Sequence, residues 1–518
     1  MKKIIIPVLF FVTIFSSIHY VNAQQINASD FVYYSQKSSF ITEYDVPVSD
    51  FGLKGITTDD LGNVWLYHSN NTSSKIIKFA KQSQQFTQYD IEKSTETTDM
   101  IINLAGGQII YEYDNVWFTD TRTNSIGRLD PNTREINLYS IPTKNSGPFG
   151  LAFEPNHKRL WFTEFASNKL AVLDVNSNSI QEFDLKEGSG PIFIAFDKSG
   201  DMWITLSYLH SILRINLEEL SIKGLNFEEY SLPKPDTFSP FGITILDDLG
   251  VQKIVLSDHG SNRIILSDLA SNLESYSSYW TSPPSVYPQT LPGQVVSDKK
   301  GNIFFAQHGG NRISKITNNT MTEFEIPTGP LSTTVYLTVS NDKVWFSEVL
   351  ANKIGSLDLN NEIPIKIDLS QSYLSLGDKQ DSLDVFISGN QSNLLGDISL
   401  SLVGMTDSGI QGIEYSFIPN KINFTESIAK STLNVSAKNL PSGFYDAMIQ
   451  VSMHDSINKN MTVSFLKPIS ISINDMREQS VMTQTKDSSI EFILLGLVGV
   501  IGIFLLYRRI KLKNKLLN

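Results

Sequence analysis

Four acidic side chains occupy the same place in a phrase that the sequence repeats. The phrase reads WFTDTRTNSIG at residues 117–127, WFTEFASNKL at 161–170 and WFSEVLANKIG at 345–355. Its acids are Asp120, Glu164 and Glu348, and a related phrase with valine in place of tryptophan carries Asp258. Carboxylate oxygens are the ligands that hard divalent cations prefer, but a carboxylate at a strand end also accepts backbone N–H bonds as a turn cap. The spacing alone leaves both roles open.

Two histidines stand beside these positions in neighbouring repeats. His259 follows Asp258, and His308 follows Gln307, which replaces the acid. Imidazole titrates near neutral pH and is therefore the usual general base for removing a proton. The surrounding residues, Asp-His-Gly-Ser and Gln-His-Gly-Gly, are also good turn formers, so a structural role is the alternative. The other histidines beyond the N-terminal segment are His68 and His210 at corresponding places, His157 in a hairpin expected on the opposite face, and His454 outside the repeats.

The acids and histidines belong to units that recur every 41 to 52 residues. Each unit contains four short strand-like pieces, such as FGLAFEP, RLWFTEF, KLAVLDV and SIQEFDL in the third, separated by Gly, Asn, Asp, Ser and Pro. A period of this length indicates a propeller or a solenoid, but the turns of a β-solenoid are usually shorter. The sequence therefore predicts an all-β chain with a seven-bladed β-propeller over residues 40–361.

This architecture predicts where the repeated side chains lie. Successive strands of a blade run antiparallel, so the start of strand one and the end of strand two share one face of the disc. We expect Phe149 and Glu164 to be neighbours there, the repeated Trp to pack between blades, and the Asn at plus seven to form a left-handed turn. The ring of corresponding positions contains His68, Asp120, Glu164, Leu206, Asp258, Gln307 and Glu348.

Over about residues 50–370 these units resemble the virginiamycin B lyase (streptogramin lyase) family. The resemblance is carried by the form G-P-x-G-[IL]-[AT]…[LV]-W-F-[TS]-[ED]-x-x-x-N-x-[IL]-G. It implies a magnesium-dependent carbon–oxygen lyase that linearises a cyclic depsipeptide by elimination, with a histidine removing a proton and carboxylates helping to hold Mg²⁺. The resemblance thus makes His259 and His308 candidate catalytic residues, and it makes Asp120, Glu164, Asp258 and Glu348 candidate magnesium ligands.

The sequence also departs from the family pattern. The family carries a further histidine at the start of strand one, where this chain has Phe149, Ile192 and Phe241. We expect the phenylalanines to line a partly apolar pocket for a small-molecule or peptide ligand. The alternative function is therefore a non-catalytic surface propeller that recognises a glycan, a peptide or an envelope partner. A lactonase of the regucalcin type fits less well, because it needs a few isolated ligands rather than a ring.

Composition limits the function classes further. The net charge of −12 excludes a typical nucleic-acid binder, which needs a basic surface. The chain has no cysteine and so no disulfides. Alternating runs such as SLDVFISG and STLNVSAK predict an immunoglobulin-like β-sandwich over residues 362–475, serving as a glycan-coated spacer. Eight N-x-S/T sequons support an exported chain only weakly.

The two ends predict attachment to the cell membrane. Residues 1–23 have the pattern of a secretory signal peptide, with an uncleaved anchor helix as the alternative. Residues 476–489 suggest a stalk, residues 490–507 a single transmembrane helix, and the basic residues 508–518 a cytoplasmic tail. The propeller and sandwich would then lie outside the cell, held by one helix.

Overall fold

The computed structural model describes residues 37–70, 73–91, 106–219, 227–231, 238–248, 250–271, 273–283, 289–340, 342–361, 365–376, 380–389, 394–404, 412–422, 428–438 and 440–473. These residues belong to one compact unit. The predicted signal peptide, stalk, transmembrane helix and basic tail lie outside them. Among the described residues there is no helix with the length and apolarity needed to cross a bilayer.

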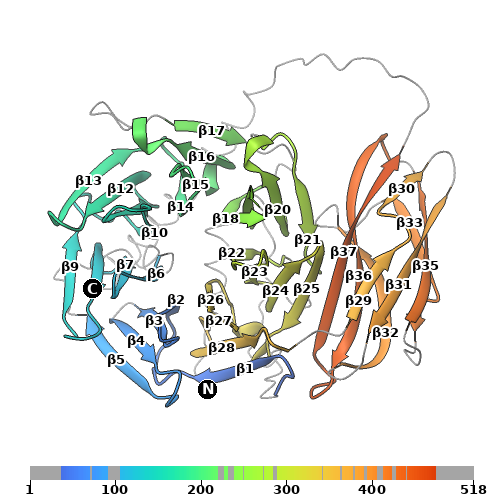
Figure 1. Ribbon diagram of the computed structural model, residues 1–518, viewed down its shortest axis with the longest axis horizontal. Helices are drawn as coiled ribbons and strands as arrows, with labels where there is room; N and C mark the ends of the chain where they lie inside the picture. Colours follow the sequence, from blue (N-terminus) through green and yellow to red (C-terminus); the bar gives the residue numbers. More distant parts are fainter. Residues whose placement is uncertain are drawn as a thin grey trace, which may run out of the picture. The chain divides into compact units, whose positions relative to one another are not determined.

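Each of the repeats folds as a set of four antiparallel strands, as the sequence predicts (Figure 1). Sheet A contains β2 (Leu53–Thr58), β3 (Val64–Ser69), β4 (Ser74–Phe79) and β5 (Phe86–Ile91). Sheet B contains β6 (Ile109–Glu112), β7 (Asn115–Asp120), β8 (Ser125–Leu129) and β9 (Ile136–Ser140). Sheet C contains β10 (Pro148–Phe153), β11 (Arg159–Glu164), β12 (Lys169–Asp174) and β13 (Ser179–Asp184). Sheet D contains β14 (Pro191–Phe196), β15 (Met202–Leu206), β16 (Ser211–Ile215) and β17 (Phe227–Ser231).

The remaining repeats follow the same order. Sheet E contains β18 (Pro240–Asp248), β19 (Val251–Asp258), β20 (Arg263–Asp268) and β21 (Ser277–Trp280). Sheet F contains β22 (Pro292–Ser297), β23 (Ile303–Gln307), β24 (Arg312–Thr317) and β25 (Thr320–Glu325). Sheet G contains β26 (Leu337–Ser340), β27 (Lys343–Glu348), β28 (Lys353–Asp358) and, as its outer strand, the N-terminal β1 (Ile41–Asp45). Short 3₁₀ turns occur at η2 (Ser207–Leu209), η3 (Leu217–Glu219), η4 (Leu269–Ser271) and η5 (Gly329–Leu331).

The sheets form a propeller-like ring. The first strand of each sheet contacts the first strand of the next, from β2 through β6, β10, β14, β18 and β22 to β26, and β26 contacts β2 again. Figure 1 shows these strands facing a common centre, with the fourth strands outside. The ring is closed without a covalent link, because the outer strand of sheet G comes from the start of the described chain and pairs with β28.

The combined side-chain volume of two residues that face each other on neighbouring strands explains why phenylalanine and glycine recur together in the repeat. Phe118 lies directly opposite Gly127 and Phe346 opposite Gly355, so each ring covers a residue without a side chain. A Cβ added at either glycine would lie 2.0 Å from the Cζ of the facing phenylalanine. Where the aromatic residue is absent the glycine is absent too, as in the pair Leu256 and Ile265 of sheet E. The pairs thus keep a similar total volume, which a close-packed interior requires.

The asparagine of the repeat ties four of the sheets to the next, through Asn124, Asn168, Asn262 and Asn311. Its backbone is left-handed, with φ of 49° at Asn124, 56° at Asn168 and 58° at Asn262, as predicted. The Asn168 side-chain oxygen accepts a bond from the N–H of Gly190, which precedes sheet D, at 3.0 Å. Asn262 accepts one from the N–H of Thr290, which precedes sheet F, at 2.8 Å. One side chain therefore shapes a turn and fixes the start of the following sheet.

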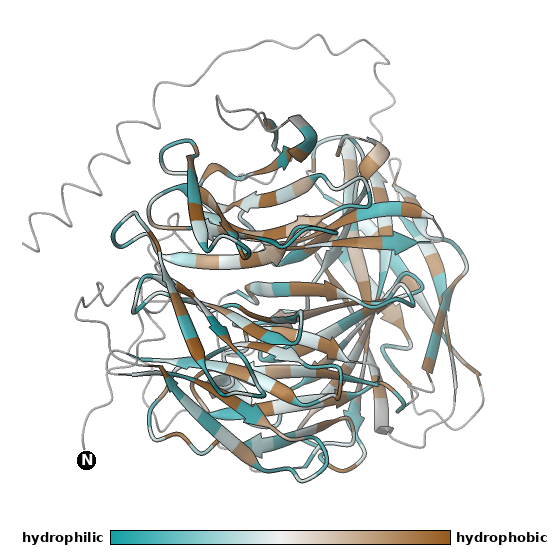
Figure 2. Ribbon diagram, turned by 60° about the vertical axis from the view of Figure 1, so that its left-hand side comes forward, coloured by the Kyte–Doolittle hydropathy of each residue, from teal (hydrophilic) through white to brown (hydrophobic). Residues whose placement is uncertain are grey.

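Hydrophobic side chains fill the spaces between the sheets. Figure 2 shows brown residues along the strands and teal residues in many of the connecting turns. Trp161 of sheet C is buried with Ile194, Met202 and Ile204 of sheet D, which confirms that the repeated tryptophan packs between sheets. Its indole N–H donates to Glu154 at 2.9 Å, in the hairpin between β10 and β11.

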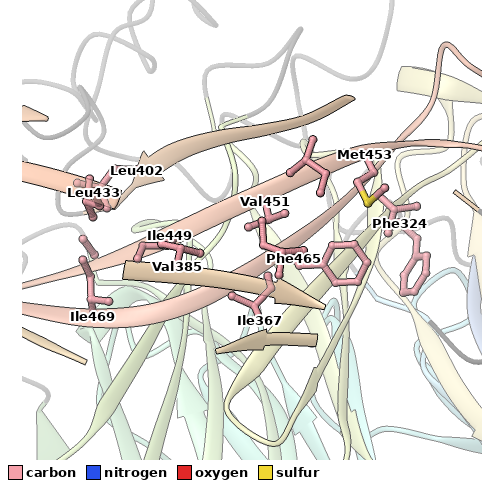
Figure 3. Close-up of a cluster of buried hydrophobic side chains, with 14 of the residues drawn as sticks. Phe324, Ile367, Val385, Leu402, Leu433, Ile449, Val451, Met453, Phe465 and Ile469 are labelled. Carbon is pink, nitrogen blue, oxygen red and sulfur yellow. The ribbon is translucent and has the colours of Figure 1, made fainter. Parts of the chain in front are cut away.

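The C-terminal described residues form two further sheets that share a core. One contains β29 (Ile365–Leu369), β31 (Asp381–Gly389), β35 (Ile428–Ala437) and β33 (Ile413–Ile418). The other contains β30 (Tyr373–Leu376), β37 (Thr462–Ile473), β36 (Gly443–Asp455), β32 (Leu394–Val403) and β34 (Lys421–Ile422). Figure 3 shows Val385, Leu433 and Ile449 among the buried side chains of this C-terminal sandwich.

The C-terminal sandwich, predicted as a glycan-coated spacer, is hydrogen-bonded along a strand edge to the propeller-like ring. Strand β37 pairs antiparallel with β25, the outer strand of sheet F, from Met321 opposite Leu466 to Phe324 opposite Val463. Sheet F and one sheet of the sandwich are therefore continuous. Hydrogen bonding across a strand edge fixes the relative position of its two partners, which a flexible linker would not.

Candidate functional site

The strand register places the repeated acids on one face, at the start of the inner strands. Glu164 is opposite Pro148, Asp258 is opposite Pro240, and Gln307 is opposite Pro292. His68 is opposite Leu53 in the same way. The prediction that strand-one starts and strand-two ends share a face is confirmed. We call this side of the ring the axial face.

Aromatic rings fill the centre of the axial face. Phe149 is 5.6 Å from Phe193 and 5.9 Å from Phe241, measured between ring centroids, and Phe193 is 6.3 Å from Tyr336. All four are buried, and the most exposed of them, Tyr336, is 4% accessible. We expected Phe149 and Phe241 to line a partly apolar pocket. They are instead packed against each other and against residues of other sheets, as a plug.

His259 and His308 continue this plug. The His259 ring stacks on Phe241 at 5.1 Å and on His308 at 6.2 Å, and both imidazoles are 3% exposed. The Nδ1 atom of His259 lies 3.0 Å from the carbonyl oxygen of Pro292. Because a carbonyl only accepts, Nδ1 carries the proton and donates it to this bond. The structure therefore brings the two candidate bases together, as their sequence positions suggested.

Burial makes both histidines weak bases. Loss of hydration lowers the pKa of His259 to about 4, although the bond to Pro292 acts in the opposite direction. Burial and the neighbouring His259 lower the pKa of His308 to about 3. Both rings are thus neutral at neutral pH, but their basicity is far below the value that general-base catalysis near pH 7 favours.

Asp120 and Asp258 are engaged in local bonds. Asp120 accepts from the hydroxyl of Tyr67 at 2.9 Å, from Ser74 Oγ at 3.1 Å and from the N–H of Arg122 at 2.9 Å. Asp258 accepts from Arg263 Nε at 2.9 Å and from backbone N–H groups on either side of its turn. Both carboxylates are fully buried. These contacts match the turn-capping alternative.

Glu164 and Glu348 lie next to a second carboxylate from the outer strand of their own sheet. Burial is the main reason that the pKa of Glu164 rises to about 7, and Glu182 adds to the rise. Burial and Glu43 hold the pKa of Glu348 well above its usual range. The cation after the repeated asparagine contacts the outer carboxylate: Lys169 lies 3.1 Å from Glu182, and Lys353 lies 3.0 Å from Glu43.

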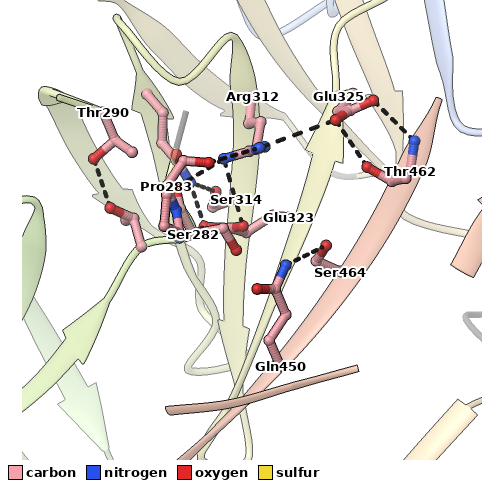
Figure 4. Close-up of polar contacts among 12 residues, drawn as sticks. Ser282, Pro283, Thr290, Arg312, Ser314, Glu323, Glu325, Gln450, Thr462 and Ser464 are labelled. Carbon is pink, nitrogen blue, oxygen red and sulfur yellow. Dashed lines mark hydrogen bonds and ion pairs between the residues drawn. The ribbon is translucent and has the colours of Figure 1, made fainter. Parts of the chain in front are cut away.

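Gln307, which replaces the repeated acid in sheet F, also lies next to a carboxylate from the outer strand of its own sheet. Its side-chain nitrogen donates to Glu323 on the outer strand of sheet F and to Ser314, both at 2.7 Å. Arg312, which follows the repeated asparagine, lies 3.9 Å from Glu323 (Figure 4). Sequence reasoning missed the outer-strand carboxylates Glu43, Glu182 and Glu323. The signal that could have found them is the cation that follows the repeated asparagine in these three sheets, namely Lys353, Lys169 and Arg312.

The predicted magnesium ligands do not fit a shared metal site. Within the described ranges, no three His, Asp or Glu side chains lie close enough to coordinate one ion. The four acids come from four different sheets, and each is buried among contacts of its own sheet or the sheet beside it. A magnesium ion needs several oxygen ligands around one point. We therefore derive no chemical step through such an ion.

The other histidines have separate environments. The Nε2 atom of His68 lies 3.0 Å from the carbonyl oxygen of Asp50, and His210 Nδ1 contacts the carbonyl oxygen of Phe238. His157 lies in the hairpin opposite the axial face with its side chain 58% exposed, and His454 lies in β36 of the sandwich.

A partly buried phenylalanine and an exposed tyrosine extend from the plug to the surface. Phe165 follows Glu164 and lies 6.0 Å from Phe149, between ring centroids. Its other face contacts Tyr208 of η2 at 5.3 Å, and Tyr208 is 38% exposed. The aromatic cluster thus reaches solvent between sheets C and D on the axial face.

Two hollows lie away from this face. One, of about 640 Å³, lies between sheets E and F and is lined by Tyr276, Tyr279 and Asn319 among others. The second, of about 440 Å³, lies between sheets C and D at their hairpin ends, beside Glu154, His157 and Asp201. Neither hollow includes a predicted site residue.

Comparison with known proteins supports the resemblance expected from the repeats. Residues 39–264 match the sequence profile of the virginiamycin B lyase family, and this range contains β1, sheets A to D and part of sheet E. Virginiamycin B lyase from Staphylococcus aureus superposes with a TM-score of 0.51 at 24% identity, covering 62% of this chain and 99% of the enzyme. A streptogramin B lyase gives 0.51 at 27% identity, covering 62% and 97%. No functionally curated protein matches the sequence.

A third similar structure carries a ligand. It is a catalytically inactive variant of the S. aureus lyase with quinupristin, and it gives a TM-score of 0.51 at 24% identity over 62% of this chain and 99% of the other. The predicted resemblance to the virginiamycin B lyase family is thus confirmed for the propeller-like part of the chain.

Proposed function

We propose that this chain, whose residues 39–264 match the virginiamycin B lyase family, is a binding propeller that recognises a peptide-like ligand without cleaving it. The observation that carries the proposal is the aromatic plug. Phe149 and Phe241 stand at strand starts where the family carries a further histidine, and together with Phe193 they occupy the centre of the axial face. These apolar rings contain no group that could move a proton.

The state of the histidine pair supports the same function. An elimination beside an ester needs a base that reaches the substrate proton and has a pKa near the working pH. His259 and His308 are 3% exposed, and burial lowers their pKa values to about 4 and about 3. Asp120 and Asp258 are engaged in local hydrogen bonds, and the described His, Asp and Glu side chains form no group of three that could hold one ion. The chain thus keeps the family scaffold, while its two candidate catalytic histidines are buried and weakly basic.

The ligand contact in this proposal is the partly buried Phe165 together with the exposed Tyr208. Aromatic rings supply rigid contact area at low entropic cost and a hydroxyl for orientation. The quinupristin complex of a similar propeller makes a cyclic depsipeptide the reasonable first probe.

The test incubates the purified full-length chain with quinupristin and Mg²⁺. We expect saturable binding, measured by calorimetry, and no new product after long incubation. Elimination opens the ring without a change of mass, whereas hydrolysis adds one water, so chromatography and mass spectrometry together distinguish the reactions. A product of unchanged mass and new retention time would establish the lyase and overturn the proposal.

Variants separate binding at the axial face from adventitious binding. Tyr208→Ala should weaken the binding of quinupristin by about tenfold, because it removes an exposed aromatic contact worth on the order of 1 kcal/mol or more. Tyr113→Ala is the control, since Tyr113 is 41% exposed but lies in the β6–β7 hairpin at the opposite end of its sheet. Equal affinities of both variants would contradict the axial-face site, and the absence of saturable binding would exclude this ligand class.

We further propose that sheets A to G are the seven blades of one closed propeller and that the C-terminal sandwich is of the immunoglobulin class. The contacts from β26 back to β2 and the shared core of the two C-terminal sheets support this assignment. An experimental map with sheet G separated from sheet A would contradict it.

The location at the cell surface is also a proposal. It rests on residues 1–23 and 490–507, whose composition fits an export signal and a membrane span. Protease added to intact cells should remove the propeller and leave a membrane-bound C-terminal fragment. Protection of the whole chain until the cells are lysed would contradict this topology.

A further inference from the structure

The closing strand of the ring is the starting point for an inference about the C-terminal sandwich. Strand β1 is five residues long and completes sheet G by pairing with β28, from Ile41 opposite Leu357 to Asp45 opposite Lys353. No covalent connection joins β1 to β28, because β1 comes from residues 41–45 and the other three strands of sheet G come from residues 337–358. Short strands at a sheet edge are among the first elements to open locally.

The sandwich binds the residues immediately before this strand. Asp455, at the end of β36, accepts bonds from Ser38 Oγ, from the N–H of Ser39 and from Ser39 Oγ, each at 2.8 Å. The Asp455 side chain is buried, and Ser456 adds a contact to Ser39 at 2.8 Å. Bonds to an ionised acceptor are among the strongest hydrogen bonds of a protein.

The same sandwich holds the neighbouring sheet F. Strand β37 lies beside β25 as an additional strand, and Thr462 donates to Glu325 through its N–H at 2.9 Å and its hydroxyl at 2.8 Å. Figure 4 shows Glu325 between Thr462 and Arg312, so this contact continues into the polar network of sheet F. Lys467 reaches Thr320 at 3.1 Å on the other end of β25.

Apolar packing joins the two attachments. Phe40, directly before β1, contacts Phe324 of β25 with ring centroids 5.3 Å apart. Both belong to a buried cluster that also contains Met453 and Phe465 of the sandwich, and Figure 3 shows these two beside Phe324. The point where sheets F and G meet is therefore covered from outside by one set of sandwich residues.

We propose that the C-terminal sandwich is a clamp that keeps the propeller ring closed. It grips sheet F through β37 and the closing strand of sheet G through Asp455, so the two sides of the junction cannot separate unless the sandwich detaches. The function of the sandwich is then to maintain the ring, in addition to any role in presenting the propeller. This inference does not depend on what the axial face binds.

The experiment measures backbone hydrogen exchange of the full-length chain. In Asp455→Ala, amides of residues 41–45 should exchange about tenfold faster or more, because the variant lacks three bonds to a buried carboxylate. Amides of β11 and β12, on the other side of the ring, should exchange at the wild-type rate. Asp446→Ala is the matched control: Asp446 also lies in β36 but is exposed and accepts from Ser470 at 3.2 Å.

A second variant keeps the test decisive if Asp455→Ala folds poorly, since Asp455 also accepts from Ile457 and Asn458 in its own turn. The double substitution Ser38→Ala and Ser39→Ala removes the two hydroxyl bonds to Asp455 from the propeller side, keeps the bond from the Ser39 N–H and leaves that turn intact. Ile41 is left out of the comparison for the double variant, because its own N–H donates to Ser38 Oγ. Faster exchange confined to residues 42–45 in either variant supports the clamp. Unchanged exchange there, or equal acceleration throughout the ring, would overturn it.

Discussion

The imidazoles of His259 and His308 are stacked, with ring centroids 6.2 Å apart and 24° between their planes. They come from neighbouring sheets, and Phe241 covers the opposite face of His259. Two neutral rings can pack in this way, whereas two imidazolium ions at this separation would repel each other in an apolar environment. The pair is therefore a stable part of the plug only while both rings are neutral.

This arrangement predicts a loss of stability in acid. In the unfolded chain both histidines bind protons as the pH falls below about 6.5, but in the folded chain they do so only near pH 4 and pH 3. The unfolded state therefore binds more protons in this window, and the free energy of unfolding falls as the pH falls. His308→Phe keeps a ring and removes one titration. Its melting temperature should fall less than that of the wild type between about pH 7 and about pH 4.5.

The exposed His454 provides the control for this measurement, because His454→Phe removes a histidine from the surface of β36. Its melting temperature should follow the wild-type dependence on pH. A His308→Phe variant with the full wild-type loss in acid would show that His308 titrates freely in the folded chain.

For Glu164 we expect the contribution to stability to change with pH in the direction opposite to that of the two histidines. Its pKa is about 7 in the folded chain and near 4.5 in the unfolded chain. Between these values the folded state binds more protons, so the contribution of this group to stability falls as the pH rises. Glu164→Gln cannot ionise, and its stability relative to the wild type should therefore increase from about pH 4.5 to about pH 7 in urea titrations. The exposed Glu187→Gln should show no such trend, and a flat difference for Glu164→Gln would refute the assignment.

Removing one partner of the buried ion pair between Asp258 and Arg263 should strongly lower the free energy of unfolding. Both side chains are at most 4% exposed, and Arg263 Nε lies 2.9 Å from Asp258 Oδ2. Arg263→Met leaves the carboxylate buried without its cation, so we expect a loss of about 3 kcal/mol in the free energy of unfolding. Lys169→Met removes the equivalent cation from a pair that is partly solvated, and the loss should stay below about 1 kcal/mol. Comparable losses in denaturant titrations would contradict this ranking.

The volume rule of facing strands can be tested by exchange between repeats. Gly355→Ile should destabilise the chain by about 1–3 kcal/mol, because its Cβ meets the ring of Phe346. Adding Phe346→Leu creates the Leu–Ile pair that sheet E already has at residues 256 and 265. The double variant should recover at least about 1 kcal/mol in a double-mutant cycle of unfolding free energies. Additive losses would show that the pair does not share one volume.

The repeat could be predicted from the sequence because the features that define it lie close together along the chain. The period, the strand pieces and the left-handed asparagines follow from short-range chemistry, and the register then places Glu164 and Asp258 on the axial face. The volume match of Phe346 and Gly355 is also visible once the strands are aligned. These features depend on residues within one unit, so one sequence contains them.

The environment of the site could not be read in the same way. The burial of His259 depends on rings from several sheets, and the sequence gives each ring only as an apolar residue at a strand start. Glu182 and Glu323 lie in outer strands, where alternation suggests a solvated side chain. The pairing of β25 with β37 joins positions more than a hundred residues apart, as the Glu325 and Thr462 contact shows, and no repeat marks it.

The reach of the asparagine side chain has a consequence for how such a chain can grow or shrink. The side-chain oxygen of Asn168 in sheet C holds the start of sheet D, and that of Asn262, two sheets further along in sheet E, holds the start of sheet F. A duplication of one whole repeat includes an asparagine that can hold the start of the sheet after it. A duplication that ends in the middle of a sheet separates the asparagine from the backbone N–H to which it is bonded. Insertions of complete units should therefore be tolerated where fragments of units are not.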